Sequence, residues 1–305
     1  MATEGGNKAI IAALFANISI AVTKFIAFLL TSSSSMLAES IHSVADSSNQ
    51  GLLLLGGKRA KRDATPEHPF GYGRERYVYA FVVAIVLFSL GGLFALYEAY
   101  HKWADPHPIE NWQWVPVTVL LTAIALESYS LWTAVKESNA IRGDQSWVEF
   151  VRKAKAPELP VVLLEDIGAE LGLVFALIGV SLTLATDNGR WDAAGTAMIG
   201  ILLVLIAIIL AIEMKSLLLG EAASDSAIRR IREALVGDGT EGVTEVIHMR
   251  TMHLGPEELL VTAKIAVPGA ASADDTASAI NAAEARVREV EPLAQMIYLE
   301  PDRPR

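Results

Sequence analysis

The sequence contains no cysteine among its 305 residues. Disulfide bonds and thiolate metal sites are therefore excluded, and any bound metal must use nitrogen and oxygen ligands. Basic residues are also in short supply: 25 lysines and arginines stand against 35 aspartates and glutamates, for a formal net charge of −10 at pH 7. Because no basic run with interleaved aromatic residues is present, nucleic acid is not an expected partner.

Long polar stretches are scarce before residue 220, and hydrophobic residues make up 52% of the chain. A helix that crosses a bilayer needs about 20 mostly apolar residues. The chain is therefore predicted to be a membrane all-α bundle with lipid around it, and no cleavable signal peptide is expected. Six segments have the required length: Ala9–Leu30, Met36–Leu55, Tyr77–Tyr100, Trp114–Val135, Leu159–Ala185 and Ala194–Leu219.

Lysine and arginine are distributed unevenly between the two sides of this bundle. The loops after the second and fourth segments are rich in them, whereas the opposite side has only Lys102 and Arg190. Short loops with excess positive charge stay in the cytoplasm. We therefore expect a multi-pass protein with both termini cytoplasmic, in a bacterial inner (cell) membrane.

The polar tail, residues 220–305, is predicted to be a separate cytoplasmic domain after a transport domain of residues 1–219. Ser224–Val236 and Ala271–Val290 show helical spacing, and three segments alternate as strands: "GVTEVIHMRTMHL", "LLVTAKIAV" and "AQMIYLE". The order α-β-β-α-β predicts a ferredoxin-like α+β domain with helices on one face of an antiparallel sheet. It is interpreted as a solubility and dimerisation module, with metal sensing as the alternative.

The second segment contains "SMLAESIHSVADSSNQ", Ser35–Gln50, in which Glu39, His42 and Asp46 follow one another at helical spacing. These side chains share one stripe of a helix. A charged side chain at the bilayer centre costs roughly 2.5–3.5 kcal/mol on insertion scales. A bound cation would remove that cost, whereas the alternative is a hydrogen-bonded polar seam between helices.

The fifth segment contains a second acidic group, "VVLLEDIGAELG", with Glu165, Asp166 and Glu170. If the two segments face each other, one imidazole and several carboxylates can form a four-coordinate site. Such a ligand set suits Zn²⁺ best, with Mn²⁺, Co²⁺, Fe²⁺ or Cd²⁺ as alternatives. Elsewhere, Lys24 is expected to pair with an acid on a neighbouring segment.

Two motifs give the chain a resemblance to a known family. "AESIHSVAD" and "HPFGYGRERY" resemble motifs of the cation diffusion facilitators, and further details resemble the branch that contains the animal mitochondrial zinc exporter. The resemblance implies a homodimeric secondary transporter, not an enzyme, whose transmembrane and C-terminal domains form the dimer. It implies export of a divalent metal, usually Zn²⁺, in exchange for protons by alternating access. A non-transporting membrane metal sensor is the alternative function.

The resemblance also implies ligand positions. His42 and Asp46 match the family's two ligands on the second segment, and Asp166 matches the second ligand on the fifth. The first position on the fifth segment holds Val162, which cannot bind metal. Glu165 is the nearest substitute, although it lies about 100° from Asp166 around an ideal helix. Glu39 and Glu170 are the alternatives for this fourth ligand.

Overall fold

The computed structural model describes residues 18–109, 112–237 and 242–303. The chain divides into two compact units. One unit comprises the residues up to Gly56 together with Val78–Met214, and the other comprises Gly57–Tyr77 together with the residues from Lys215 onward. The predicted separation of a transport domain from a cytoplasmic domain at residue 219 stays a prediction.

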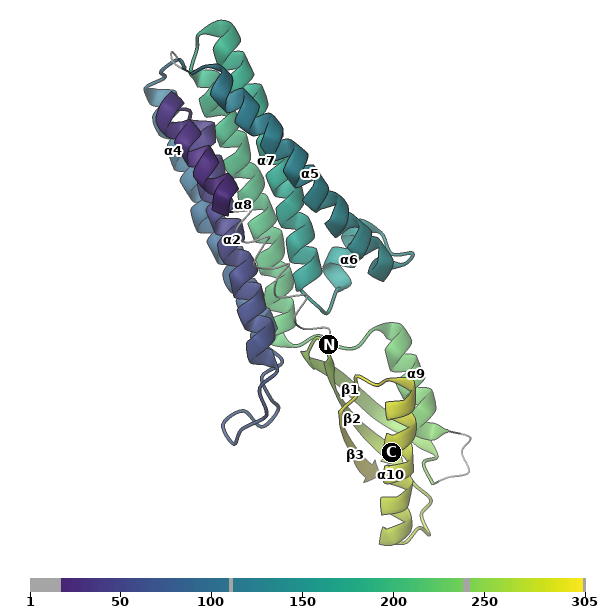
Figure 1. The fold of residues 1–305 in the computed structure, drawn as a ribbon. Helices are drawn as coiled ribbons and strands as arrows, with labels where there is room; N and C mark the ends of the chain where they lie inside the picture. The colour runs from purple at the N-terminus through teal and green to yellow at the C-terminus, as the bar shows by residue number, and fades with distance from the viewer. Residues whose placement is uncertain (1–17, 110–111, 238–241, 304–305) are drawn as a thin grey trace, which may run out of the picture. The chain divides into compact units, whose positions relative to one another are not determined.

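The first unit is a bundle of long helices (Figure 1). The predicted first segment is helical over Ile18–Thr31, and its earlier residues lie outside the described part of the chain. The short helix α6 was not predicted, because seven residues are too few to show a helical period. After the first helix come α2 Ser34–Ala60, α3 Glu75–Val86, the π-helical turn η1 Leu87–Leu93, α4 Phe94–Ala104, α5 Trp114–Arg142, α6 Trp147–Lys153, α7 Glu158–Thr186 and α8 Arg190–Leu219.

Four helices of the described chain are long and apolar enough to cross a membrane. They are Glu75–Ala104, which combines α3, η1 and α4, and the helices α5, α7 and α8. Helix α2 has 27 residues, but its serines, acids, imidazole and amide lower its hydropathy. The bundle of apolar helices is thus observed, whereas six membrane spans stay a prediction.

The start of α2 is fixed by an acid from another helix. Asp192, in the first turn of α8, accepts hydrogen bonds from Ser33 Oγ at 2.9 Å and from Ser34 backbone N at 2.7 Å. Its own backbone N donates to Thr183 Oγ1 on α7 at 2.9 Å. Because free backbone N–H groups at a helix start need acceptors, this buried carboxylate caps α2 and joins three helix ends.

Helices α7 and α8 approach each other closely where both have glycines. A Cβ atom at Gly195 would lie 2.8 Å from the backbone oxygen of Phe175, and one at Gly179 would lie 2.8 Å from the backbone oxygen of Trp191. Small residues let membrane helices pack with their backbones in contact. This crossing holds α7, which carries Glu165 and Asp166, against α8.

The second unit contains the sheet domain, with the element order α-β-β-α-β. It consists of α9 Asp225–Val236, β1 Glu245–Gly255, β2 Glu258–Ala266, α10 Ala273–Val290 and β3 Met296–Asp302. Both helices cover the same face of the sheet (Figure 1). Ser224 caps α9 by accepting from Ala227 backbone N, and Ser272 and Asp275 form a capping box at the start of α10.

The prediction of a purely antiparallel sheet was wrong. β1 and β2 pair antiparallel, but β2 and β3 pair parallel, in the order β1-β2-β3. The physical reason is the connection: α10 crosses over between β2 and β3, and a helical crossover returns the chain in the same direction. The core beneath the helices is aliphatic and includes Ile231, Leu235, Val261, Ile265 and Val287.

The loop Gly57–Tyr77 packs within this second unit against the β1–β2 turn. Gly73 approaches the turn so closely that a Cβ atom there would lie 3.1 Å from Leu254 backbone oxygen. Arg76 Nη1 lies 3.3 Å from Glu257 Oε1, and Arg74 Nη2 lies 3.4 Å from Met252 Sδ. Gly73 of "HPFGYGRERY" is thus needed for contact with the turn.

Candidate metal centre

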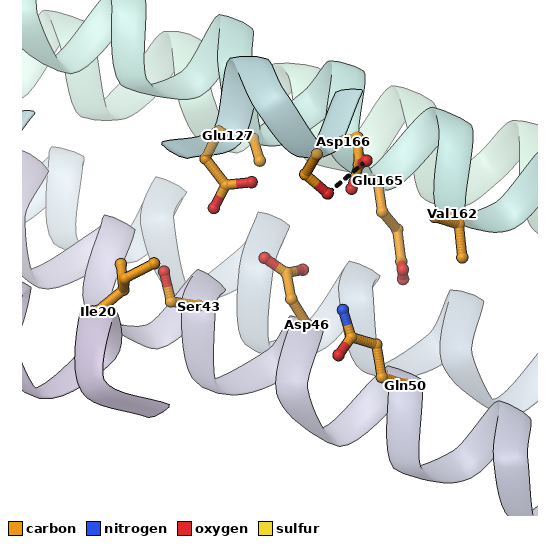
Figure 2. A pocket seen from close by; sticks show the side chains of 10 residues that line it. Ile20, Ser43, Asp46, Gln50, Glu127, Val162, Glu165 and Asp166 are labelled. Carbon is orange, nitrogen blue, oxygen red and sulfur yellow. Dashed lines mark hydrogen bonds between the residues drawn. The ribbon is translucent and has the colours of Figure 1, made fainter. Parts of the chain in front are cut away.

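An acidic cavity of about 30 Å³ lies between the first helix, α2, α5 and α7. One water-sized molecule needs roughly 10–15 Å³ by this measure, so the cavity holds about two. Figure 2 shows Asp46 reaching from one wall toward Glu127 and Asp166 on the other. The cavity is lined by Ile20, Ser43, Asp46, Gln50, Glu127, Ser130, Val162, Glu165, Asp166 and Ala169.

Helical spacing explains which residues line the cavity. From α7 come Val162, Glu165, Asp166 and Ala169, which follow at i, i+3, i+4 and i+7 and therefore share one face. The 100° between Glu165 and Asp166 does not separate them, since the face is wide enough to include both. Val162 takes the place where a ligand was expected and makes that part of the wall apolar.

Polar neighbours hold the two adjacent acids of α7. Asn49 Nδ2, on α2, donates to Glu165 Oε1 at 2.7 Å. Ser130 Oγ, on α5, donates to Asp166 Oδ2 at 3.0 Å, the bond drawn as a dashed line in Figure 2. Each carboxylate is thus directed toward the space between three helices.

Glu170 lies outside this cavity. It is one turn beyond Asp166 on α7, and its Oε1 accepts a hydrogen bond from Ser128 Oγ at 3.0 Å. It does not belong to the cavity lining. The structure therefore separates this alternative ligand from the acids around Asp46.

His42 lies beside the cavity rather than in its wall. Its side chain is buried, and its Nδ1 is 3.6 Å from Oδ1 of Asp46. Within the described part of the chain, neither ring nitrogen makes a hydrogen bond. A buried imidazole that makes no hydrogen bond is costly, so a proton shared with Asp46 or a bound metal would stabilise His42 at this position.

Glu39 is paired with a lysine. Lys24 Nζ, on the first helix, lies 3.0 Å from Glu39 Oε2, and both side chains are buried. The prediction that Lys24 pairs with an acid on a neighbouring segment is confirmed. Glu39 does not line the cavity.

Glu127 lines the cavity, although it was not among the ligands predicted from the sequence. It projects from α5 into the same cavity as Asp46 and Asp166 (Figure 2). The signal in the sequence was an acid inside the apolar run "TAIALES". With no partner residue at helical spacing, Glu127 gave no recognisable ligand pair, and only the packing of α5 on α7 brings it to the site.

The charges of the cavity are of one sign. Four carboxyl side chains line it, and none of the described residues in its lining is basic. Carboxylates crowded in a water-poor space need protons or a cation to neutralise them. In this conformation, however, no group of three or more His, Asp or Glu side chains among the described residues is close enough to hold a metal ion.

A helical bundle that encloses an acidic cavity is an arrangement typical of cation transporters. Residues 10–219 match the family model described as the cation efflux transmembrane domain. The chain therefore belongs to the cation efflux family, also called cation diffusion facilitators, which is a family of transporters and not of enzymes.

Curated relatives agree with the family. The chain is 31% identical over 237 residues to the human mitochondrial proton-coupled zinc antiporter SLC30A9, covering 77% of this chain and 42% of that protein. It is 27% identical over 264 residues to metal tolerance protein C4 of Arabidopsis thaliana, covering 86% and 57%. The zinc transporter ZitB of Pectobacterium atrosepticum is 33% identical over 124 residues, covering 40% and 37%. The chain thus spans about half the length of the first two relatives.

Proposed function

We propose that this protein is an efflux transporter that exchanges a divalent transition metal, Zn²⁺ above all, for protons by alternating access. The observation that carries the proposal is the cavity lined by Asp46, Glu127, Glu165 and Asp166 inside the helical bundle. Further support comes from a relative named a proton-coupled zinc antiporter. The metal is the cargo and is expected to bind and leave in each cycle.

The proposed ligands come from α2 and α7. Asp46, Glu165 and Asp166 supply carboxylate oxygens from the cavity, and His42 supplies the nitrogen that favours Zn²⁺ over Mg²⁺ or Ca²⁺. His42 stands beside Asp46, and the proposal requires that this part of α2 rotates to turn the ring toward the cavity when the metal binds. Glu127 compensates for Val162 by offering a carboxylate oxygen from α5.

Proton exchange follows from competition for the same atoms. A metal binds only deprotonated carboxylates and a neutral imidazole, so binding releases protons and protonation releases the metal. When the site opens to the more acidic side, protons replace the metal. The protonated site is then free to return without cargo.

The proposal includes a membrane arrangement. Ile18–Thr31 and α2 complete six membrane helices with the four apolar ones, both termini face the cytoplasm, and two copies form a dimer. The human relative is named mitochondrial, and the comparisons give no support to the predicted bacterial cell membrane. The proposal therefore names no particular membrane.

Zinc flux tests the proposal. The full chain is reconstituted in vesicles containing a zinc-sensitive dye, with and without a pH gradient. We expect zinc uptake that depends on the gradient and is largely lost in Asp46→Asn. Glu137→Gln, an exposed acid of α5, is the matched control and should transport normally.

Two outcomes would contradict the proposal, the first its site and the second transport itself. If the Asp46→Asn variant folds and still moves zinc at the unmutated rate, the cavity is not the transport site. Tight zinc binding without flux, insensitive to the gradient, would instead identify the chain as a membrane metal sensor.

A further inference from the structure

A lysine side chain is buried inside the helical bundle. Lys24 is 1% exposed, and its Nζ donates to Glu39 Oε2 at 3.0 Å and to Ser43 Oγ at 2.9 Å. Glu39 is 0% exposed. A buried charge that loses its partner is strongly destabilising, so the ammonium and the carboxylate depend on each other.

Ser43 connects this ion pair to the acidic cavity. Glu39 and Ser43 are one turn apart on α2, and Ser43 lines the cavity together with Asp46. The Ser43 hydroxyl therefore links the Lys24 ammonium to the lining of the cavity. Lys24 brings a fixed positive charge to the edge of a site whose described lining carries acids and no basic residue.

Glu39 retains unused capacity as a ligand. Its Oε1 is buried and makes no hydrogen bond within the described part of the chain. This oxygen faces α7, where a Cβ atom at Gly172 would lie 2.8 Å from it. Glu39 is also one turn before His42 on α2, so it stands between the two helices that carry the proposed ligands.

We propose that Lys24 is a specificity-determining residue, which keeps Glu39 out of the metal's ligand set. This inference rests on the proposed function. A site with one imidazole and few carboxylates suits Zn²⁺, whereas each added oxygen favours metals that take more oxygen ligands, such as Mn²⁺. By engaging Glu39, the ammonium limits the number of oxygens available to the cargo.

The test compares the affinities of the purified full chain for Zn²⁺ and Mn²⁺ by calorimetric titration. In Lys24→Met, Glu39 is released, and the affinity for Mn²⁺ relative to Zn²⁺ should rise roughly tenfold, or about 1.4 kcal/mol. Lys24→Arg should keep the wild-type ratio. Lys24→Met combined with Glu39→Gln should restore it, because the extra carboxylate is then gone.

A wild-type ratio in folded Lys24→Met would overturn the inference and leave the ion pair a purely structural role. Glu39→Gln decides the matter even if Lys24→Met fails to fold. With Lys24 present it should keep the wild-type ratio, and a tenfold loss of zinc affinity would make Glu39 itself a ligand and overturn the inference.

In the same titration, Asp46→Asn distinguishes a failure of the proposed metal site from a failure of the role of Lys24. If it loses zinc binding while Lys24→Met keeps the wild-type ratio, only the role of Lys24 fails. If it binds zinc normally, the proposed site fails, and the role of Lys24 fails with it.

Discussion

Asn49 donates a hydrogen bond of 2.7 Å from its Nδ2 to Oε1 of Glu165, and thereby joins α2 to α7 beside the acidic cavity. Both side chains are buried. Because Asp46 is three residues before Asn49 on α2, this bond also sets how the Asp46 and Glu165 carboxyl groups face each other. The Glu165 carboxyl group on α7 is thus oriented by the Asn49 amide on α2.

Replacing Asn49 by leucine should destabilise the bundle by roughly 1–3 kcal/mol, the usual cost of leaving a buried hydrogen-bonding group without its partner. Thermal unfolding of the purified protein measures the loss. Ser48→Ala is the control, because Ser48 is exposed and donates only locally, to Val44 backbone oxygen at 2.9 Å. Equal stability of the two variants would contradict the importance of the Asn49 bond.

Asp192→Ala should loosen the start of α2. The variant removes the acceptor for Ser33 Oγ and for Ser34 backbone N, and we expect a loss of roughly 2–4 kcal/mol. Hydrogen exchange of the first amides of α2 measures the effect locally. Asp105→Ala, at an exposed acid beyond α4, is the control and should leave these amides protected. Equally fast exchange of these amides in Asp192→Ala and Asp105→Ala would contradict the capping role of Asp192.

Two glycine-to-alanine changes should have opposite effects. A Cβ atom at Gly195 meets the Phe175 backbone oxygen at 2.8 Å, so Gly195→Ala forces α7 and α8 apart and should cost about 1–3 kcal/mol. Gly51 on α2 is exposed, with nothing within 4 Å of the added atom, and Gly51→Ala should be neutral or stabilising by about 0.5–1 kcal/mol. The unfolding midpoints of the two variants are compared with that of the wild type. A Gly195→Ala variant as stable as the wild type would contradict the close crossing of α7 and α8.

Glu258, at the start of β2, gives the second unit a pH dependence. Burial, followed by the neighbouring charge of Glu257, raises the pKa of the Glu258 carboxyl group, and its Oε2 has no hydrogen-bond partner in the described chain. A pKa raised by folding stabilises the folded unit below the ordinary pKa, and this stabilisation is lost as pH rises through the raised value. At about pH 8, the amides of the β1–β2 hairpin should therefore be better protected from hydrogen exchange in Glu258→Gln than in the wild type.

Near pH 4 that advantage should disappear, because the wild-type carboxyl group is then largely protonated. Hydrogen exchange of hairpin amides in the full chain measures both conditions. Glu245→Gln, an exposed acid of β1, is the control and should show no such difference. An advantage for Glu258→Gln that does not depend on pH would contradict the explanation.

Much of the fold followed from local patterns in the sequence. Apolar length located α5, α7 and α8, and alternation located β1, β2 and β3. The direction of β3 was missed because the strand's own pattern is the same in either direction, and the crossover through α10 decides it. Helix α6 was missed because its Ser146 cap and short length carry little periodic signal.

The site was predictable to the extent that spacing along one helix defines it. Helical spacing grouped Asp46 with Glu39 and His42, whereas Glu165 and Asp166 were selected as adjacent acids of the fifth apolar segment. The structure places Asp46, Glu165 and Asp166 in one cavity, and Glu39 and His42 outside its lining. The place of Glu127 in the cavity, and the choice of Glu39 as the acid that pairs with Lys24, could not be derived in this way, because both depend on which helices pack together. A single acid in an apolar run indicates a functional position but not its neighbours.

The most direct test of the account is the position of bound zinc. Anomalous scattering at the zinc absorption edge, from crystals of the full chain grown with Zn²⁺, locates the metal without assumptions about its ligands. The account predicts a peak between α2, α5 and α7, within bonding distance of Asp46 and Asp166. A fully occupied zinc ion elsewhere in the protein, with no peak in this cavity, would contradict it.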